Sequence, residues 1–242
     1  MPIKERIKKF FASFMFNPRW KCSVCDAENF NESIFCEKCE SELPFNDGYI
    51  CAHCGRKTIA ATNFCSTCAE KMTAIDRARS VFVYEGSIPK LIMGLKYFNK
   101  RYLVEYFGEK LANLYLQNYF GADFIGFIPM TEKALSKRGY NQSRLLAEEV
   151  SKITSVPLYE GIEKVKETKR QAKLNRQERL KNLEGAFRVF ERAKIKDKEI
   201  VIIDDVSTTG ATAQAVADKL KRAGAKRVYL ITVASTPPFE KY

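Results

Sequence analysis

The feature that most constrains the fold is the stretch IVIIDDVSTTGAT at residues 200–212. Its first four residues are apolar, which is typical of a buried parallel strand. Two adjacent carboxylates, Asp204 and Asp205, follow the strand, and a hydroxyl-rich loop around Gly210 leads into a helix predicted over residues 213–223. Because the first turn of a helix has unpaired N–H groups and a partial positive charge, this order predicts an anion site.

The predicted ligand is a sugar phosphate. No lysine follows Gly210, so the loop is not a Walker loop. The two carboxylates suit the hydroxyls of a ribose, with its phosphate in the loop beyond. The stretch resembles the phosphoribosyl pyrophosphate (PRPP) loop of type I phosphoribosyltransferases. That resemblance implies a PRPP site made of Asp204, Asp205, Val206, Ser207, Thr208, Thr209, Gly210, Ala211 and Thr212. In an active enzyme, Asp204 and Asp205 would be the catalytic contacts to ribose or Mg²⁺.

All eight cysteines lie in two copies of one motif, C-x2-C-x10-C-x2-C, repeated at an offset of 29 residues. Two such knuckles bring four thiolates to one metal ion, which predicts two structural Zn²⁺ sites without an open catalytic position. The ligands are Cys22, Cys25, Cys36 and Cys39 in the first copy, and Cys51, Cys54, Cys65 and Cys68 in the second. The only histidine, His53, is a spacer inside the second copy, so Ser/His and Cys/His nucleophilic catalysis are excluded.

The chain divides into four predicted parts: a basic amphipathic helix at 1–19, zinc modules at 20–45 and 46–72, and a large domain at 78–242. Apolar residues of segment 3–16 fall on one helical face, which fits docking on a partner or domain, or peripheral contact with an anionic membrane. No apolar run is long enough for a membrane span, and the start lacks a secretory cleavage site. We therefore expect a cytoplasmic protein, with peripheral contact at the inner face of the membrane as an option.

From residue 80 onward, strands and helices alternate. Strands are expected at 81–84, 124–128, 187–190, 199–204 and 228–233, and helices at 91–98, 102–119, 141–152 and 213–223. This alternation predicts an α/β fold with a parallel sheet and helices on both faces. Residues 164–181 lack a clear apolar period at their start and predict a basic loop leading into a short helix.

Positive charge is concentrated in the large domain. Residues 1–80 hold 12 basic and 10 acidic side chains, whereas the rest of the chain holds 29 and 19. A basic surface favours nucleic acid, anionic membrane or phosphorylated substrates. Tyr97, Phe98, Tyr102 and Tyr140 are candidate stacking platforms for bases, although such aromatics are more often core. The candidate DNA contacts are Lys169, Arg170, Lys173, Arg176, Arg179, Lys96 and Arg138.

Further motifs point to one family. They are Pro129 with KRGYNQ at 137–142, the spaced residues Thr168, Gln171, Leu174, Arg179 and Asn182 before GAF at 185–187, LKY at 95–97, and the loop at 204–212. Together with the second four-cysteine module, they resemble the ComF family of competence proteins over roughly residues 50–236. The resemblance implies a phosphoribosyltransferase fold behind a zinc finger, and a cytoplasmic role in natural transformation when incoming single-stranded DNA is received.

Three functions fit this sequence. The first is a DNA-uptake protein that binds single-stranded DNA and a ribose phosphate or PRPP, with Mg²⁺ accompanying PRPP. The second is an active phosphoribosyltransferase on a small nucleobase or other amine, although no acceptor site is recognisable. The third is a non-catalytic scaffold that contacts proteins of the uptake machinery through the zinc modules and segment 3–16.

Overall fold

The computed structural model describes residues 20–30, 33–70, 73–118, 120–168 and 182–237. Contacts divide the chain into two compact units, Met1–Leu43 and Pro44–Tyr242. The segment predicted to form an amphipathic helix at 3–16 lies outside the described residues. No helix within the described ranges combines the length and the apolar character needed to cross a bilayer.

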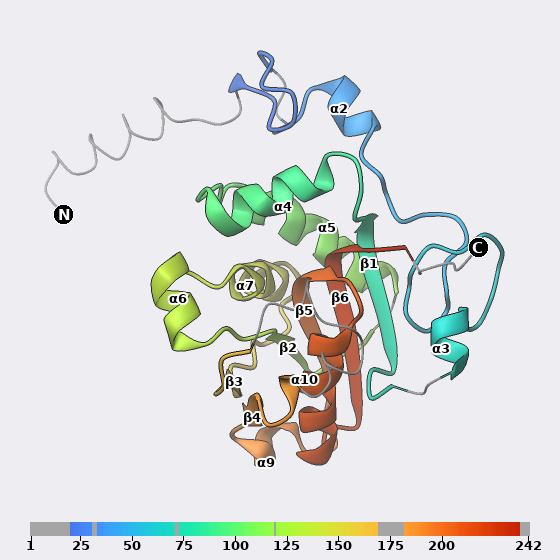
Figure 1. The fold of residues 1–242 in the computed structure, drawn as a ribbon, viewed down its shortest axis with the longest axis vertical. Coiled ribbons are helices and arrows are strands. Elements are labelled where there is room, and N and C mark those ends of the chain that lie inside the picture. Colours follow the sequence, from blue (N-terminus) through green and yellow to red (C-terminus); the bar gives the residue numbers. More distant parts are fainter. Residues whose placement is uncertain (1–19, 31–32, 71–72, 119, 169–181, 238–242) are drawn as a thin grey trace, which may run out of the picture. The chain divides into compact units, whose positions relative to one another are not determined.

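The second unit is built on a parallel sheet of four strands, as the sequence predicts. The strand order is β1-β6-β5-β2, with every neighbouring pair parallel (Figure 1). The strands are β1 (Arg77–Val83), β2 (Phe124–Phe127), β5 (Glu199–Ser207) and β6 (Arg227–Ser235). β5 is a central strand, so the expected sugar-phosphate loop leaves the sheet from its middle.

Helices cover both faces of this sheet, which confirms the predicted class. α5 (Leu103–Gln117) and α7 (Gln142–Thr154) pack on one face, and α4 (Ile88–Tyr97) packs against α5. α10 (Ala211–Arg222) covers the other face, where Val216 and Leu220 share a core with Ile200 and Ile202 of β5. Val201 and Ile203 belong to the opposite face, because successive side chains of a strand alternate.

In the domain predicted at 78–242, three short elements were not expected from the sequence: α6 (Glu132–Arg138), β3 (Ile162–Lys164) and α9 (Arg192–Ile195). α6 buries no side chain, so no apolar stripe in the sequence indicates it. The helix begins after Thr131, which caps its first turn, and ends before Gly139, which adopts φ 83°. β3 pairs with β4 (Phe187–Val189) in a separate antiparallel ribbon. The expectation that the strand at 187–190 joins the parallel sheet is therefore wrong.

Strand β5 is also longer than predicted. The expected end at Asp204 is wrong because β6 continues beside β5 and pairs Val206 with Ala234 and Ser207 with Ser235. Both carboxylates therefore lie within the strand rather than after it. Helix α10 correspondingly begins at Ala211, immediately behind Gly210.

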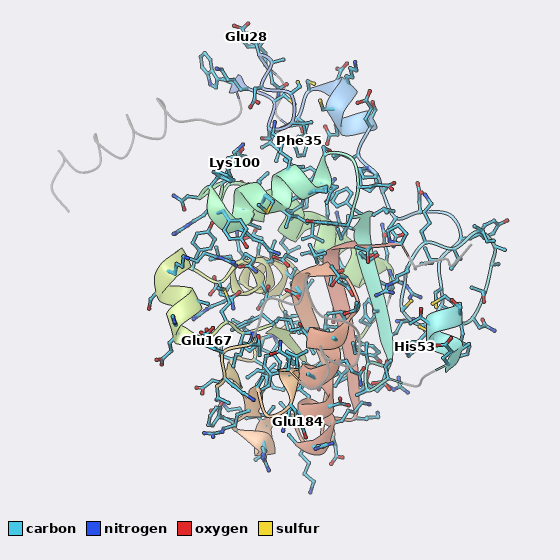
Figure 2. All side chains as sticks on the ribbon, in the orientation of Figure 1. Glu28, Phe35, His53, Lys100, Glu167 and Glu184 are labelled. Carbon is cyan, nitrogen blue, oxygen red and sulfur yellow. The ribbon has the colours of Figure 1, made fainter. Side chains whose placement is uncertain are left out.

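The second four-cysteine module, which includes α3 (Ser66–Glu70), belongs to the same compact unit as the sheet. His53 lies beside β1 in Figure 2, and its carbonyl accepts a hydrogen bond from the Ala78 N–H at 2.7 Å. The Asn46 side chain joins the two parts, because its amide donates to the Gly55 carbonyl at 2.7 Å and to the Ser80 hydroxyl at 2.9 Å. The module is thus attached along the edge strand of the sheet.

Candidate functional site

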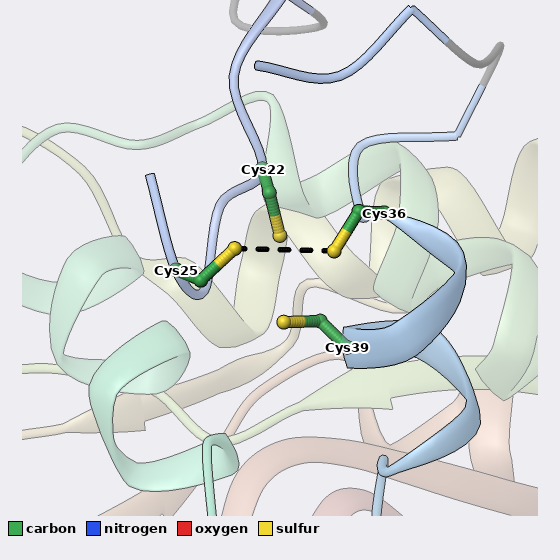
Figure 3. Close-up of side chains that lie close together, drawn as sticks. All are labelled: Cys22, Cys25, Cys36 and Cys39. Atoms are coloured by element: carbon green, nitrogen blue, oxygen red, sulfur yellow. Dashed lines mark hydrogen bonds between the residues drawn. The ribbon is translucent and has the colours of Figure 1, made fainter. Parts of the chain in front are cut away.

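Each set of four cysteines converges on one point. Within each set, the four sulfur atoms lie within 4.8 Å of one another. Figure 3 shows the first set, in which the Cys25 and Cys36 sulfurs are 3.9 Å apart; Cys54 and Cys65 of the second set are 3.7 Å apart. Zn–S bonds of about 2.3 Å in a tetrahedron place the sulfurs about 3.8 Å apart. Both sets therefore fit Zn²⁺.

Burial and mutual repulsion disfavour ionised thiols in the second set. Burial raises the pKa of the Cys54 thiol to about 12, and the neighbouring charges of Cys51 and Cys65 add to this. Four thiolates at this spacing thus repel one another and are not ionised together by the protein alone. A dication bound there would neutralise that repulsion and leave no open coordination position, which fits structural zinc.

The two carboxylates of β5 have different partners. The Asp205 carboxylate is buried and forms an ion pair of 2.8 Å with the ammonium of Lys96, from α4. The Asp204 carboxylate accepts a hydrogen bond of 2.8 Å from the Ser143 hydroxyl, in the first turn of α7, and one of 2.9 Å from the Asp205 N–H. α4 and α7 thus each place one polar side chain against the end of β5.

These contacts shift the pKa values of two groups. Burial, reinforced by the neighbouring charge of Asp205, raises the pKa of Asp204 to about 7, although the Ser143 hydroxyl and Lys96 act in the opposite direction. Burial also disfavours the charged form of Lys96, but the charge and hydrogen bond of Asp205 outweigh it and raise the pKa of Lys96 above its ordinary value. Lys96 is therefore a fixed cation, whereas Asp204 changes charge near neutral pH.

A pocket of about 250 Å³ opens above this pair of carboxylates. Gly210 adopts φ 74° immediately before the first residue of α10, a backbone conformation that favours glycine. The first turn of α10 lines the same space, and the N-terminus of a helix favours an anion. The lining residues are Tyr84, Lys96, Asp204, Val206, Ser207, Thr208, Gly210, Ala211, Thr212, Ala213 and Leu230.

The structure brings most of the predicted ligand residues together. Of the stretch 204–212, all but Asp205 and Thr209 line the pocket, and Asp205 lies behind it in its ion pair with Lys96. Arg138 lies over the Tyr97 ring at 5.0 Å and donates to the Gln142 side chain. The remaining candidate DNA contacts, Lys169, Arg170, Lys173, Arg176 and Arg179, lie outside the described residues.

The candidate stacking platforms divide into two groups. Tyr97 and Phe98 are 59% and 69% exposed and follow Lys96 directly in the chain. Tyr140 is buried, donates its hydroxyl to the Leu95 carbonyl and lies under the guanidinium of Arg101 at 4.3 Å. Tyr140 is therefore not a free platform; it fixes the end of α4 that carries Lys96.

Sequence reasoning missed three residues at this site: Ser143, Tyr84 and Arg56. Ser143 is two residues beyond its helix cap, Asn141, whose side chain accepts from the Ser143 N–H at 3.0 Å. Tyr84 follows β1, and its N–H donates to the Ser235 carbonyl at 2.9 Å, beside the end of β5. Arg56 comes from the second zinc module and donates to the Thr208 carbonyl. The sequence order of these three residues gives no sign of this proximity.

Two domain families match this chain. The phosphoribosyl transferase domain matches residues 141–239, and the double zinc ribbon domain matches residues 11–69. DNA utilization protein YhgH of Escherichia coli (strain K12) is 28% identical over 225 residues, covering 89% of this chain and 90% of that protein. The protein of the same name from Salmonella typhi is 29% identical, covering 70% and 76%. The resemblance to the ComF family is confirmed.

Two solved structures illustrate the structural similarity of this chain to other proteins. A purine phosphoribosyltransferase from Pyrococcus horikoshii is 20% identical, with a TM-score of 0.36, and the match covers 58% of this chain and 91% of that one. Glutamine PRPP amidotransferase from B. subtilis is 18% identical, with a TM-score of 0.41, over 58% of this chain and 30% of that one.

Proposed function

We propose that this chain is a DNA-uptake protein that acts on the cytoplasmic side of the membrane. In this proposal it binds single-stranded DNA and holds a ribose-phosphate group, either of PRPP or of a strand, in the pocket at the end of β5. The name of its relatives, DNA utilization protein, and the phosphoribosyl transferase match support the proposal. The observation that carries it is the meeting of Asp204, Lys96 and the N-terminus of α10 at one pocket.

The chemistry of the pocket fits the two ends of a ribose 5-phosphate. The N–H groups of the first turn of α10 and the hydroxyls of Ser207 and Thr208 are donors, which suit the 5-phosphate. Asp204 accepts hydrogen bonds and suits the ribose hydroxyls, either directly or through Mg²⁺, which takes carboxylate and hydroxyl oxygens. Lys96 neutralises Asp205 in its ion pair, so that this carboxylate does not repel the anion.

The surface beside the pocket fits a strand. Tyr97 and Phe98 expose their rings at the end of α4, directly after Lys96, and Arg138 stacks on Tyr97. Base stacking on aromatic rings combined with nearby arginine is how proteins bind single strands without sequence preference. The basic run at 164–181 would extend these contacts along the phosphates.

Calorimetry with PRPP and with ribose 5-phosphate tests the pocket. We expect both to bind, and ribose without phosphate to bind at least about tenfold more weakly, because the loop and helix N-terminus recognise the phosphate. Asp204→Ala should weaken both ligands. Asp47→Ala, which removes an exposed carboxylate, is the matched control. Absence of binding of either phosphate by the wild-type protein would refute the pocket assignment.

Fluorescence anisotropy with a labelled oligothymidine tests the strand. We expect the affinity to fall with salt, and to fall by at least about tenfold at low salt in Arg138→Glu and in the double variant Arg176→Glu, Arg179→Glu. Arg192→Glu makes the same charge change on α9, which leads into the amino end of β5, and should leave the affinity nearly unchanged. Equal affinity of all these variants would count against DNA binding at this surface.

An active phosphoribosyltransferase is the second candidate, favoured by a groove of about 910 Å³ at the same edge of the sheet. It is lined in part by Pro129, Asn141 and Ile162, and Asn141 caps the helix that places Ser143 on Asp204. A groove next to a donor pocket gives an acceptor amine room to approach. Pyrophosphate release from PRPP in the presence of one of a panel of nucleobases would support this candidate. Bound PRPP without release across the panel would count against it.

A further inference from the structure

Arg56 is a buried cation behind the loop. Only 7% of it is exposed, and one of its guanidinium nitrogens donates to the Thr208 carbonyl. The same carbonyl accepts a second hydrogen bond of 3.0 Å from the Thr236 hydroxyl, so both of its lone pairs are engaged. Among the residues that the structure describes, Arg56 has no carboxylate within ion-pair distance.

This contact fixes the direction of a peptide group in the loop. In a trans peptide the C=O and the following N–H point in opposite directions. With the Thr208 carbonyl held toward Arg56, the N–H of Thr209 is directed away from the zinc module. The positive charge of the guanidinium also attracts an anion bound on the far side of the loop.

The position of Arg56 is set by the second zinc module rather than by the loop. Its neighbour Gly55 adopts φ 68°, and a Cβ there would lie 2.9 Å from the Arg79 Cα and closer still to the Ala78 carbonyl oxygen. The backbone of the knuckle therefore touches β1. Arg56 also closes the knuckle, because its carbonyl accepts from the Cys51 N–H at 2.9 Å. A cavity of only about 100 Å³ lies between this module and the start of α10.

We infer that the second zinc module is part of the anion site: through Arg56 it holds the phosphate loop in its binding conformation and supplies positive charge behind it. The inference rests on the proposed function, since it concerns the phosphate of the same ligand. Arg56 is a positioning residue, because it acts through the Thr208 carbonyl. Zinc binding at the second site and phosphate binding in the pocket should then strengthen each other.

Calorimetry with PRPP and ribose 5-phosphate separates the two contributions of Arg56. We expect Arg56→Lys to lose about threefold in affinity for both ligands, and Arg56→Gln, which keeps a donor without charge, to lose about tenfold. Lys57→Gln, at the adjacent exposed residue, should bind as the wild type does. Thermal melting of each variant checks that it is folded. Equal losses in the Lys and Gln variants would overturn the charge contribution, and wild-type affinity in both would overturn the inference.

The wild-type protein provides a test that needs no substitution. The equilibrium partition of zinc between the protein and a chromogenic chelator is measured with and without saturating PRPP. Because coupling between two binding affinities is reciprocal, PRPP should raise the affinity of one of the two zinc sites by at least about threefold and leave the other unchanged. Unchanged affinity at both sites, in a protein that binds PRPP, would overturn the inference alone. If the wild type binds no PRPP, the proposed function fails instead.

Discussion

The two four-cysteine modules have the same backbone conformation and differ in the residues that surround it. In the first, the Cys22 N–H donates to the Ala27 carbonyl at 2.8 Å; in the second, the Cys51 N–H donates to the Arg56 carbonyl at 2.9 Å. The bridge between Lys21 and Glu28 likewise has its counterpart between Ile50 and Lys57. Each pair is related by the 29-residue offset of the cysteines, so the duplication seen in the sequence extends to the hydrogen bonds.

The difference lies in the two residues that follow the second cysteine. Both modules need a left-handed residue there: Asp26 at φ 61° in the first and Gly55 at φ 68° in the second. Asp26 is exposed, whereas Gly55 touches β1. The next residue is the exposed Ala27 in the first module and the buried Arg56 in the second. The same backbone conformation thus exposes these two residues in the first module and buries them in the second.

The largest expected effect comes from removing the second zinc. Cys54→Ser with Cys65→Ser should lower the free energy of unfolding of the second unit by about 4 kcal/mol or more, because a structural zinc contributes folding energy directly. The matched pair Cys25→Ser with Cys36→Ser should lose one zinc and leave PRPP binding and the transition of the second unit unchanged. Calorimetric melting with zinc analysis measures both. An equal loss in the free energy of unfolding of the second unit from both pairs would contradict the difference between the two modules.

A smaller effect is expected at the left-handed position. Gly55→Ala adds a Cβ that meets the backbone of β1 and should lower the free energy of unfolding by about 3 kcal/mol, from overpacking and left-handed strain together. At the equivalent residue of the first module, Asp26→Ala should change the free energy of unfolding by at most about 1 kcal/mol, because Asp26 is exposed. Urea unfolding measures the difference, and losses of the same size at both positions would show that docking against β1 is not what selects glycine.

Several parts of the fold and of the candidate site could be predicted from local sequence. The four apolar residues of β5 and the spacing of the cysteines each determine a local structure, and the fold contains both. The length of β5 could not be predicted, because Val206 and Ser207 join the strand only through pairing with β6. α6 could not be predicted from apolar periodicity, because it buries no side chain.

The partners of the site residues depended on the tertiary fold. Lys96 was recognised as a basic residue in a motif, but its ion pair with Asp205 arises from the packing of α4 beside the end of β5. Nothing in the sequence around Gly55 and Arg56 indicates that this knuckle meets β1 and the phosphate loop.

The smallest expected effect is a pH dependence confined to the second unit. Asp204 has a folded-state pKa of about 7, against about 3.9 for an unfolded aspartate. Between these values the folded chain holds a proton that the unfolded chain has lost. The free energy of unfolding therefore falls as pH rises from about 4 to about 7, and the deficit is complete above pH 7.

Asp204→Asn removes this titration and still offers an oxygen to the Ser143 hydroxyl. We expect the variant to be about 2 kcal/mol more stable than the wild type at pH 8 without added Mg²⁺, and the two to converge toward pH 5. Taking the difference between the two proteins cancels the pH dependence of zinc binding, which both share. The transition of the first unit should be identical in both. A stability difference between the two proteins that stays constant at all pH values would mean that Asp204 keeps an ordinary pKa, and that the end of β5 does not raise it.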